Sequence, residues 1–174
     1  MSVSLPVPVR VDDGRWSVDG IDMVLVPRHL ITNNLAAAEQ ELGRVRAAAL
    51  IHGSGYRSAQ TWCQQQERFH SLGPVAVVRH YLDQLGRRGW GRFRADELDV
   101  PTGRARIIVH RSALADHSSP GPHGTCYMFG AWLEGALDYA TAGLGVPGRF
   151  EVRESRCAST GGPHCTFTGE LTAT

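Results

Sequence analysis

Residues 154–167 read Glu-Ser-Arg-Cys-Ala-Ser-Thr-Gly-Gly-Pro-His-Cys-Thr-Phe and place a carboxylate and two thiols at the spacing Glu-x2-Cys-x7-Cys. A Gly-Gly-Pro turn separates the two thiols, and such a turn lets two strand ends converge on one ion. Thiolate and carboxylate are both ligands that zinc accepts. The spacing therefore indicates a metal site that contains Glu154, Cys157 and Cys165.

A fourth ligand of the right type lies upstream in the sequence. Structural zinc ions take four tetrahedral protein ligands, whereas catalytic ions keep one position open. The complete set would be Cys126, Glu154, Cys157 and Cys165. Three thiolates and one carboxylate would leave the cluster negatively charged, so we expect the nearby Arg153 and Arg156 to act as outer partners.

The same cysteines allow other interpretations. Cys157 and Cys165 could form a disulfide across a hairpin, could be free buried thiols that behave as small apolar groups, or could be redox-active. His164 adjoins Cys165 and is the histidine best placed to replace Cys126 as a ligand. Spacing alone leaves these alternatives open.

A wider pattern surrounds these residues. Cys126 precedes a predicted helix that carries Gly130 and Gly135, and Glu-x2-Cys, a glycine and Cys-x-Phe follow. This pattern resembles the C-terminal half of the 4-vinyl reductase domain, a family that includes effector-sensing domains of bacterial aromatic-hydrocarbon activators and stand-alone hydrocarbon-binding proteins. The resemblance implies an α+β domain with an antiparallel sheet flanked by helices. It also implies a structural zinc on Cys126, Glu154, Cys157 and Cys165.

The resemblance further implies an apolar ligand pocket between helices and sheet, near the zinc. Our candidate ligand-binding residues are His110, Phe129, Trp132, Gly135 and Tyr139. Ordinary core packing is the alternative for the aromatic members. Aromatic-effector sensors of the family carry a tryptophan after an Asn-Ser-like pair, whereas this chain reads Arg-Ser-Ala at residues 111–113, which argues against a phenol-type ligand.

Composition excludes several classes of protein. All 18 basic residues are arginine and face 17 acidic ones, so the formal net charge is +1 and gives no basic excess for nucleic acid. Without lysine there is no Walker-type phosphate loop and no Schiff-base chemistry. The N-terminus lacks a signal-peptide pattern and no apolar run is long enough to span a membrane, so we expect a cytoplasmic protein.

The chain divides into a short extension and one main domain. Asp13-Gly14 and Asp19-Gly20 are hairpin signals within an alternating apolar pattern, so we expect residues 1–22 to form a β-ribbon. Residues 23–174 form the 4-vinyl reductase-like domain in this interpretation. Its first helix is predicted to begin at Asn33 or Asn34 and to end before Gly53 or Gly55.

The remaining elements follow from periodicity and turn residues. We expect helices over residues 57–70, from Pro74 to Gly86 or Gly89, and over residues 126–142. Strands are predicted at residues 90–98, 104–110, 149–156 and 165–171, with a long polar loop at residues 112–125. His117 and His123 lie in that loop and could approach one site together with His110.

These observations favour a zinc-containing domain that binds a small hydrophobic or aromatic molecule. We expect a homodimer that acts as a sensor or carrier through a separate regulatory or enzyme partner. The main alternative is a tailoring or reductase-like enzyme of a biosynthetic pathway, although the sequence contains no recognisable redox-cofactor cradle. A weaker alternative is an assembly subunit, because distant relatives of the fold serve in vesicle tethering.

Overall fold

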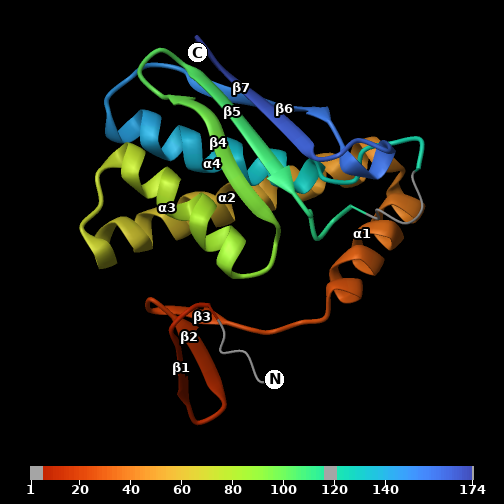
Figure 1. Cartoon of the computed structure of the whole chain (residues 1–174), viewed down its shortest axis with the longest axis horizontal. Helices are drawn as coiled ribbons and strands as arrows, with labels where there is room; N and C mark the ends of the chain where they lie inside the picture. Colours follow the sequence, from red (N-terminus) through yellow and green to blue (C-terminus); the bar gives the residue numbers. More distant parts are fainter. Residues whose placement is uncertain (1–5, 116–120, 174) are drawn as a thin grey trace.

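The computed structural model describes residues 6–115 and 121–173, which form two antiparallel sheets and four α-helices (Figure 1). The first sheet has the order β1-β2-β3, with β1 at Val9–Asp12, β2 at Arg15–Val18 and β3 at Ile21–Met23. Asp13-Gly14 and Asp19-Gly20 make its two turns, with positive φ at all four residues. This is the type I′ geometry expected of Asp-Gly hairpins. The domain division at residue 22 stays a prediction.

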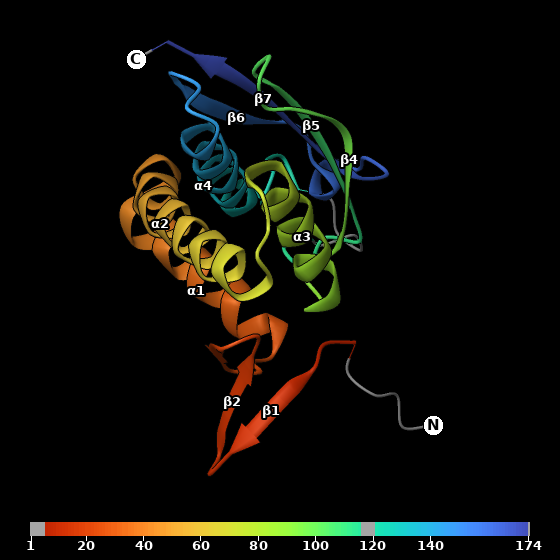
Figure 2. The same ribbon diagram turned by 90° about the vertical axis from the view of Figure 1, so that its left-hand side faces the viewer.

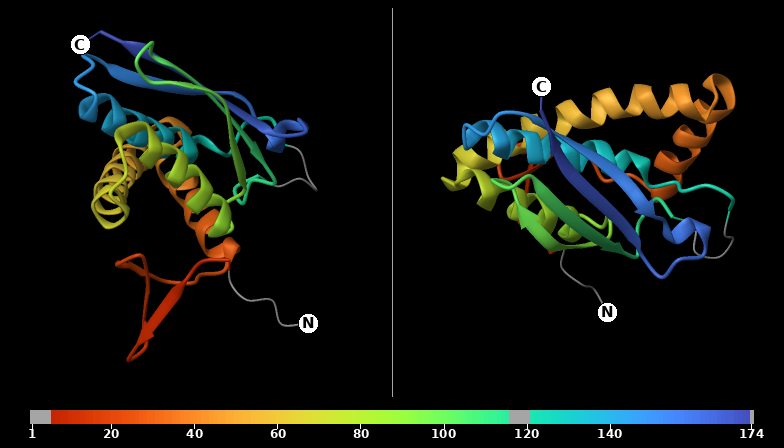
Figure 3. Two further views of the ribbon diagram at one scale, coloured as in Figure 1. Left: turned by 60° about the vertical axis from the view of Figure 1, so that its left-hand side comes forward. Right: turned by 90° about the horizontal axis from the view of Figure 1, so that it is seen from above.

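The second sheet has the strand order β4-β5-β7-β6, and every neighbouring pair is antiparallel. Its strands are β4 at Arg92–Asp99, β5 at Arg104–His110, β6 at Arg149–Arg156 and β7 at Cys165–Thr172. The helices lie on one face of this sheet, and no described element covers the other face (Figures 2 and 3). The expected antiparallel sheet with flanking helices is therefore confirmed, with the helices confined to one side.

Four helices pack beneath the sheet: α1 at Arg28–Leu42, α2 at Arg44–His70, α3 at Pro74–Arg87 and α4 at Tyr127–Gly143. The predicted start at Asn33 or Asn34 is wrong, because α1 begins directly after Pro27 and ends at Gly43, whose φ is 73°. The predicted stop at Gly53 or Gly55 is also wrong, since both glycines lie inside α2. Within the described chain, no helix is both long and apolar enough to cross a membrane.

Close packing against α4 explains why one of these glycines does not end the helix. A Cβ on Gly55 would lie 2.9 Å from Trp132 Cδ1, so this part of α2 approaches α4 more closely than a larger side chain allows. Gly135 makes the reciprocal approach from α4, because a Cβ there would lie 2.4 Å from the carbonyl oxygen of Tyr56. The packing of the two helices outweighs the cost of about 1 kcal/mol for a glycine in a helix.

Helix α4 forms the centre of the molecule. Phe129 and Leu133 pack with Ile107, Val109 and Phe167 of the sheet, and all five side chains are buried. Burial of side chains of this size contributes about 1.5–3 kcal/mol each.

A buried carboxylate, Asp138, adds directional bonds to this packing. It accepts hydrogen bonds from the Tyr56 hydroxyl at 2.8 Å and from the Phe150 backbone N–H at 2.6 Å. Asp138 therefore joins α4 to α2 and to β6.

The glycine contact gives a direct test of this packing. We expect Gly135→Ala to lower the free energy of unfolding by about 1–3 kcal/mol, because its Cβ would overlap the Tyr56 backbone. Gly130→Ala is the matched control on the same helix, since its Cβ meets only the Val152 carbonyl oxygen at 3.8 Å. Helix propensity predicts that this control is neutral or more stable by up to about 1 kcal/mol. Urea unfolding that gives equal losses for both variants would contradict the close contact.

Candidate metal centre and ligand cavity

Three elements bring the four predicted ligands to one point. Cys126 is the residue before α4, Glu154 lies near the end of β6, and Cys165 is the first residue of β7. Cys157 follows β6 directly and precedes a short 3-10 helix at Ala158–Thr160. The ligand atoms of these four residues all lie within 4.8 Å of one another. No described histidine joins the group, and the ring of His164 packs instead on His110, with 5.2 Å between the centroids.

The distances between sulfur atoms suit a shared ion. Cys165 Sγ lies 3.5 Å from Cys126 Sγ and 3.9 Å from Cys157 Sγ. Two sulfurs bound tetrahedrally to zinc at about 2.3 Å are about 3.8 Å apart. A disulfide requires about 2.05 Å, and all three cysteines are free. The geometry therefore favours metal ligation over the disulfide alternative.

Glu154 Oε1 supports the fit with a cation. This oxygen is buried and has no hydrogen-bond partner among the described residues. A buried carboxylate oxygen without a donor is costly unless a proton or a metal satisfies it. The three sulfurs beside it are also buried, so the donor set matches a closed structural zinc site.

Protons would compete with a metal for these ligands. Burial, together with the neighbouring Cys157 thiol, raises the pKa of Glu154 to about 9. Hydrogen bonds with the Cys157 and Cys165 thiols, and then burial, raise the pKa of Cys126 above its usual range. At neutral pH the metal-free cluster therefore keeps protons that a bound cation must displace.

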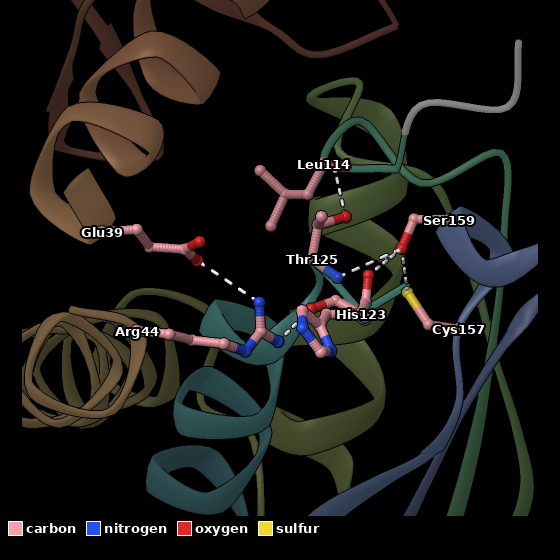
Figure 4. Close-up of polar contacts among 8 residues, drawn as sticks. Glu39, Arg44, Leu114, His123, Thr125, Cys157 and Ser159 are labelled. Carbon is pink, nitrogen blue, oxygen red and sulfur yellow. Dashed lines mark hydrogen bonds and ion pairs between the residues drawn. The ribbon is translucent and has the colours of Figure 1, made fainter. Parts of the chain in front are cut away.

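Two buried serines orient the sulfurs from outside. Ser112 Oγ lies 3.0 Å from Cys126 Sγ, and Ser159 Oγ lies 3.1 Å from Cys157 Sγ. Ser159 also accepts a hydrogen bond from the Thr125 N–H and donates one to the His123 carbonyl, which fixes the segment before α4 (Figure 4). Sequence reasoning missed both serines because a lone serine belongs to no ligand motif.

The arginine beside the centre is one that the sequence did not indicate. Arg44, the first residue of α2, donates a hydrogen bond to the Gly124 carbonyl and pairs with Glu39 at 3.5 Å (Figure 4). Gly124 lies so close to the cluster that a Cβ would meet Glu154 Oε2 at 2.8 Å. The expected partner Arg153 pairs instead with Glu151 on the surface.

The predicted ligand-binding residues do not form one group. Phe129 and Trp132 join an aromatic cluster with Trp90 and Phe93, and the Trp90 and Trp132 rings meet edge to face at 4.8 Å. The rings of this cluster pack on one another, and neither Phe129 nor Trp132 lines any of the five main cavities among the described residues.

The other three candidates have different surroundings. Gly135 contacts the Tyr56 backbone, so its small size serves helix packing. Tyr139 donates a hydrogen bond to Glu67, and His110 ends β5 beside His164. His117, the loop histidine proposed to join His110, lies outside the described residues.

A cavity of about 170 Å³ lies beside the aromatic cluster, and none of the predicted ligand-binding residues lines it. Its walls come from the linker after β3, from α1, from Trp90 and from the segment after β5. The residues that matter most here are Leu25, Ile31, Arg88, Trp90, Ala113 and Leu114. The sequence signal was the apolar run Val24-Leu25-Val26, whose three residues are exposed although they are apolar.

Comparisons with known proteins place the fold. A family model described as "Domain of unknown function (DUF5943)" matches residues 1–96. No curated protein matches the sequence.

Three solved structures share the fold. The phenol-responsive sensory domain of the transcription activator PoxR, with phenol, has a TM-score of 0.77 at 18% identity, over 94% of this chain and 84% of that one. A trafficking protein particle complex subunit 3 from Naegleria fowleri, covalently bound to palmitic acid, has a TM-score of 0.59 at 10% identity. The match covers 83% of this chain and 95% of that one. A vinyl-4-reductase family protein from Methanocaldococcus jannaschii has a TM-score of 0.54 at 13% identity. The match covers 86% of this chain and 84% of that one. At these identities the likeness concerns the fold.

Loss of one sulfur tests whether the centre holds a metal. We expect the purified chain to contain about one zinc, and Cys165→Ser to lose it and about 4 kcal/mol or more of unfolding free energy. Cys63→Ser is the control, because Cys63 is buried within α2 and lies outside the ligand group. Elemental analysis should find zinc in this control. A metal-free wild type would contradict the assignment.

Competition between metal and protons gives a second test. Because the pKa of Glu154 is raised to about 9 and that of Cys126 is raised further, metal binding must release protons between pH 6 and 8. We therefore expect zinc affinity to rise with pH in this range, about tenfold per pH unit for each proton released. Titration against a chelator of known affinity measures this slope, and an affinity independent of pH would argue against these ligands.

Proposed function

This chain belongs to the DUF5943 family, and we propose that it is a small-molecule-binding sensor or carrier domain whose buried centre holds one structural zinc. The observation that carries the proposal is the cavity beside Trp90 in a chain whose fold matches a phenol-responsive sensory domain along 94% of its length. We also propose that the chain is a 4-vinyl reductase-like domain, because it shares its fold with a vinyl-4-reductase family protein.

The size of the cavity suits a small ligand. Its volume of about 170 Å³ is close to the roughly 150 Å³ of an apolar cavity that binds benzene. Leu25, Ile31, Trp90 and Leu114 give it mainly apolar walls, which is how proteins hold hydrophobic ligands. A molecule of one ring or a short acyl chain would fill it.

Arg88 gives the cavity a polar group of fixed charge. Its Nε donates to the Gln84 carbonyl at 3.0 Å, and its guanidinium lies over the Trp62 ring at 5.3 Å. No described carboxylate pairs with it, and burial lowers its pKa. We therefore favour a ligand with an anionic end, such as a carboxylate, rather than a neutral phenol.

Trp90 connects the cavity to the zinc-bearing helix. Its ring forms one wall of the cavity and meets the ring of Trp132 on α4 at 4.8 Å. Helix α4 begins next to Cys126, so a ligand that moves Trp90 would act on a helix fixed at the metal. Two packed arrangements that differ by a few kcal/mol would suffice to report occupancy to a separate partner.

The expected homodimer remains part of the proposal. Leu42, Val45 and Leu50 are exposed by 37%, 83% and 63% around the junction of α1 and α2. A second copy of the chain that packed on this junction would remove these apolar side chains from water. Light scattering coupled to gel filtration measures the mass in solution.

Filling the cavity tests the ligand site. We expect Ala113→Leu to weaken binding of a small aromatic acid by about tenfold or more, because the added carbons occupy the cavity. Ala142→Leu is the matched control, since Ala142 is exposed near the end of α4. Calorimetric titration with toluene, phenol, benzoate and hexanoate compares neutral and anionic ligands on both variants.

The same titrations separate binding from catalysis. Saturable binding without turnover supports a sensor or carrier, whereas steady conversion of a ligand by the purified chain would favour the enzyme alternative. No saturable binding of any compound in wild type would leave the domain without a small-molecule role.

A further inference from the structure

A second group of metal-type ligands lies far from the cysteines, where the N-terminal sheet meets the helices. Asp19 belongs to the turn between β2 and β3, His70 is the last residue of α2, and His80 lies on α3. One ligand atom from each residue lies within 4.8 Å of the other two. Three separate elements thus present two imidazoles and one carboxylate to a common point.

The distances within this group suit a first-row transition metal. His70 Nε2 lies 3.2 Å from Asp19 Oδ2, and two nitrogen or oxygen ligands of one tetrahedral zinc are about 3.3 Å apart. The ring centroids of His70 and His80 are 4.7 Å apart. The His70 side chain is 33% exposed, so its ring has room to turn toward an ion.

Neighbouring side chains hold His80 and the turn that carries Asp19 in place. Gln66 contacts His80 Nε2 through its Oε1 at 2.9 Å and donates its amide N–H to the Asp19 carbonyl at 3.4 Å. The Trp62 ring stacks on His80, with 5.5 Å between the centroids. Such outer contacts fix ring orientation in known metal sites.

Local charges permit a cation at this position. Asp19 supplies one negative charge, with its side chain only 12% exposed. Arg87 on the same helix acts on His80 as a positive charge, and its pairing with Asp83 at 2.7 Å offsets part of that charge. The site is thus suited to bind a divalent ion with three protein ligands and one position open to solvent.

We propose that Asp19, His70 and His80 form a second, reversible site for a divalent transition-metal ion such as zinc or cobalt. It differs from the cysteine centre in having no thiolate and in being partly exposed, so its ion exchanges with solution. The ion would fasten the turn of the N-terminal sheet to the ends of α2 and α3. In the absence of metal, the contact between His70 Nε2 and Asp19 Oδ2 at 3.2 Å connects the turn to the end of α2 only.

Cobalt titration of the purified chain tests the proposal. We expect wild type to take up one further equivalent of Co²⁺ saturably, with weak d–d absorption and without the intense charge-transfer band of thiolate-bound cobalt. Asp19→Asn, His70→Gln and His80→Gln should each weaken this uptake about tenfold or more. Asparagine suits the first position because Asp19 has a φ of 50°, which asparagine tolerates.

His29→Gln is the matched control, because His29 is exposed on α1 and outside the group. It should bind the second equivalent as wild type does, and added metal should raise the melting temperature of both but not that of Asp19→Asn. Wild type without a second equivalent, or uptake that all three ligand variants retain, would overturn the proposal. The charge-transfer band reports separately on the cysteine centre, so cobalt bound there is counted apart from the second equivalent, and the melting comparison uses chain whose cysteine centre is already loaded with zinc.

Discussion

Three thiols and a carboxylate lie within 4.8 Å of one another at a buried point, and no covalent bond holds them there. Without a cation, these groups can coexist only by retaining protons, because several buried negative charges would repel one another. A single bound ion would remove that conflict and would join the start of α4 to the ends of β6 and β7. Glu154 Oε1 has no hydrogen-bond partner among the described residues, which leaves one oxygen of the cluster free to bind a cation.

The remaining packing is arranged around the helix that starts at this centre. Helix α4 contacts the sheet through Phe129 and Leu133, and approaches α2 closely at Gly135. Buried Asp138 then ties α4 to both α2 and β6. Displacement of the N-terminal end of α4 would disturb all of these contacts together, because a close-packed interior transmits strain.

Local sequence patterns were sufficient to predict those turns and strands whose formation depends on residues close together in the chain. The Asp-Gly turns and the strands of the main sheet could be predicted from the sequence. The Glu-x2-Cys-x7-Cys spacing indicated a shared site, and the side chains of this motif do lie together in the structure. Long-range contacts decided what the sequence could not show. Gly55 lies inside a helix because the Trp132 ring occupies the position where a larger side chain would lie. Arg44 lies beside the cysteine cluster because it donates a hydrogen bond to the carbonyl of Gly124, which is 80 residues away in the chain. Neither fact leaves a periodic or motif signal.

One short segment brings the cavity and the metal centre into contact. Ala113 and Leu114 line the cavity, while Ser112, next to them in the chain, places its hydroxyl 3.0 Å from Cys126 Sγ. The Ala113 N–H also donates to the Trp90 carbonyl, so both walls of the cavity belong to one hydrogen-bonded unit. A ligand that shifts this segment would change the surroundings of the Cys126 sulfur without touching it. The structure thus supplies a physical route by which a small molecule in the cavity could alter the cysteine cluster through a chain of direct contacts.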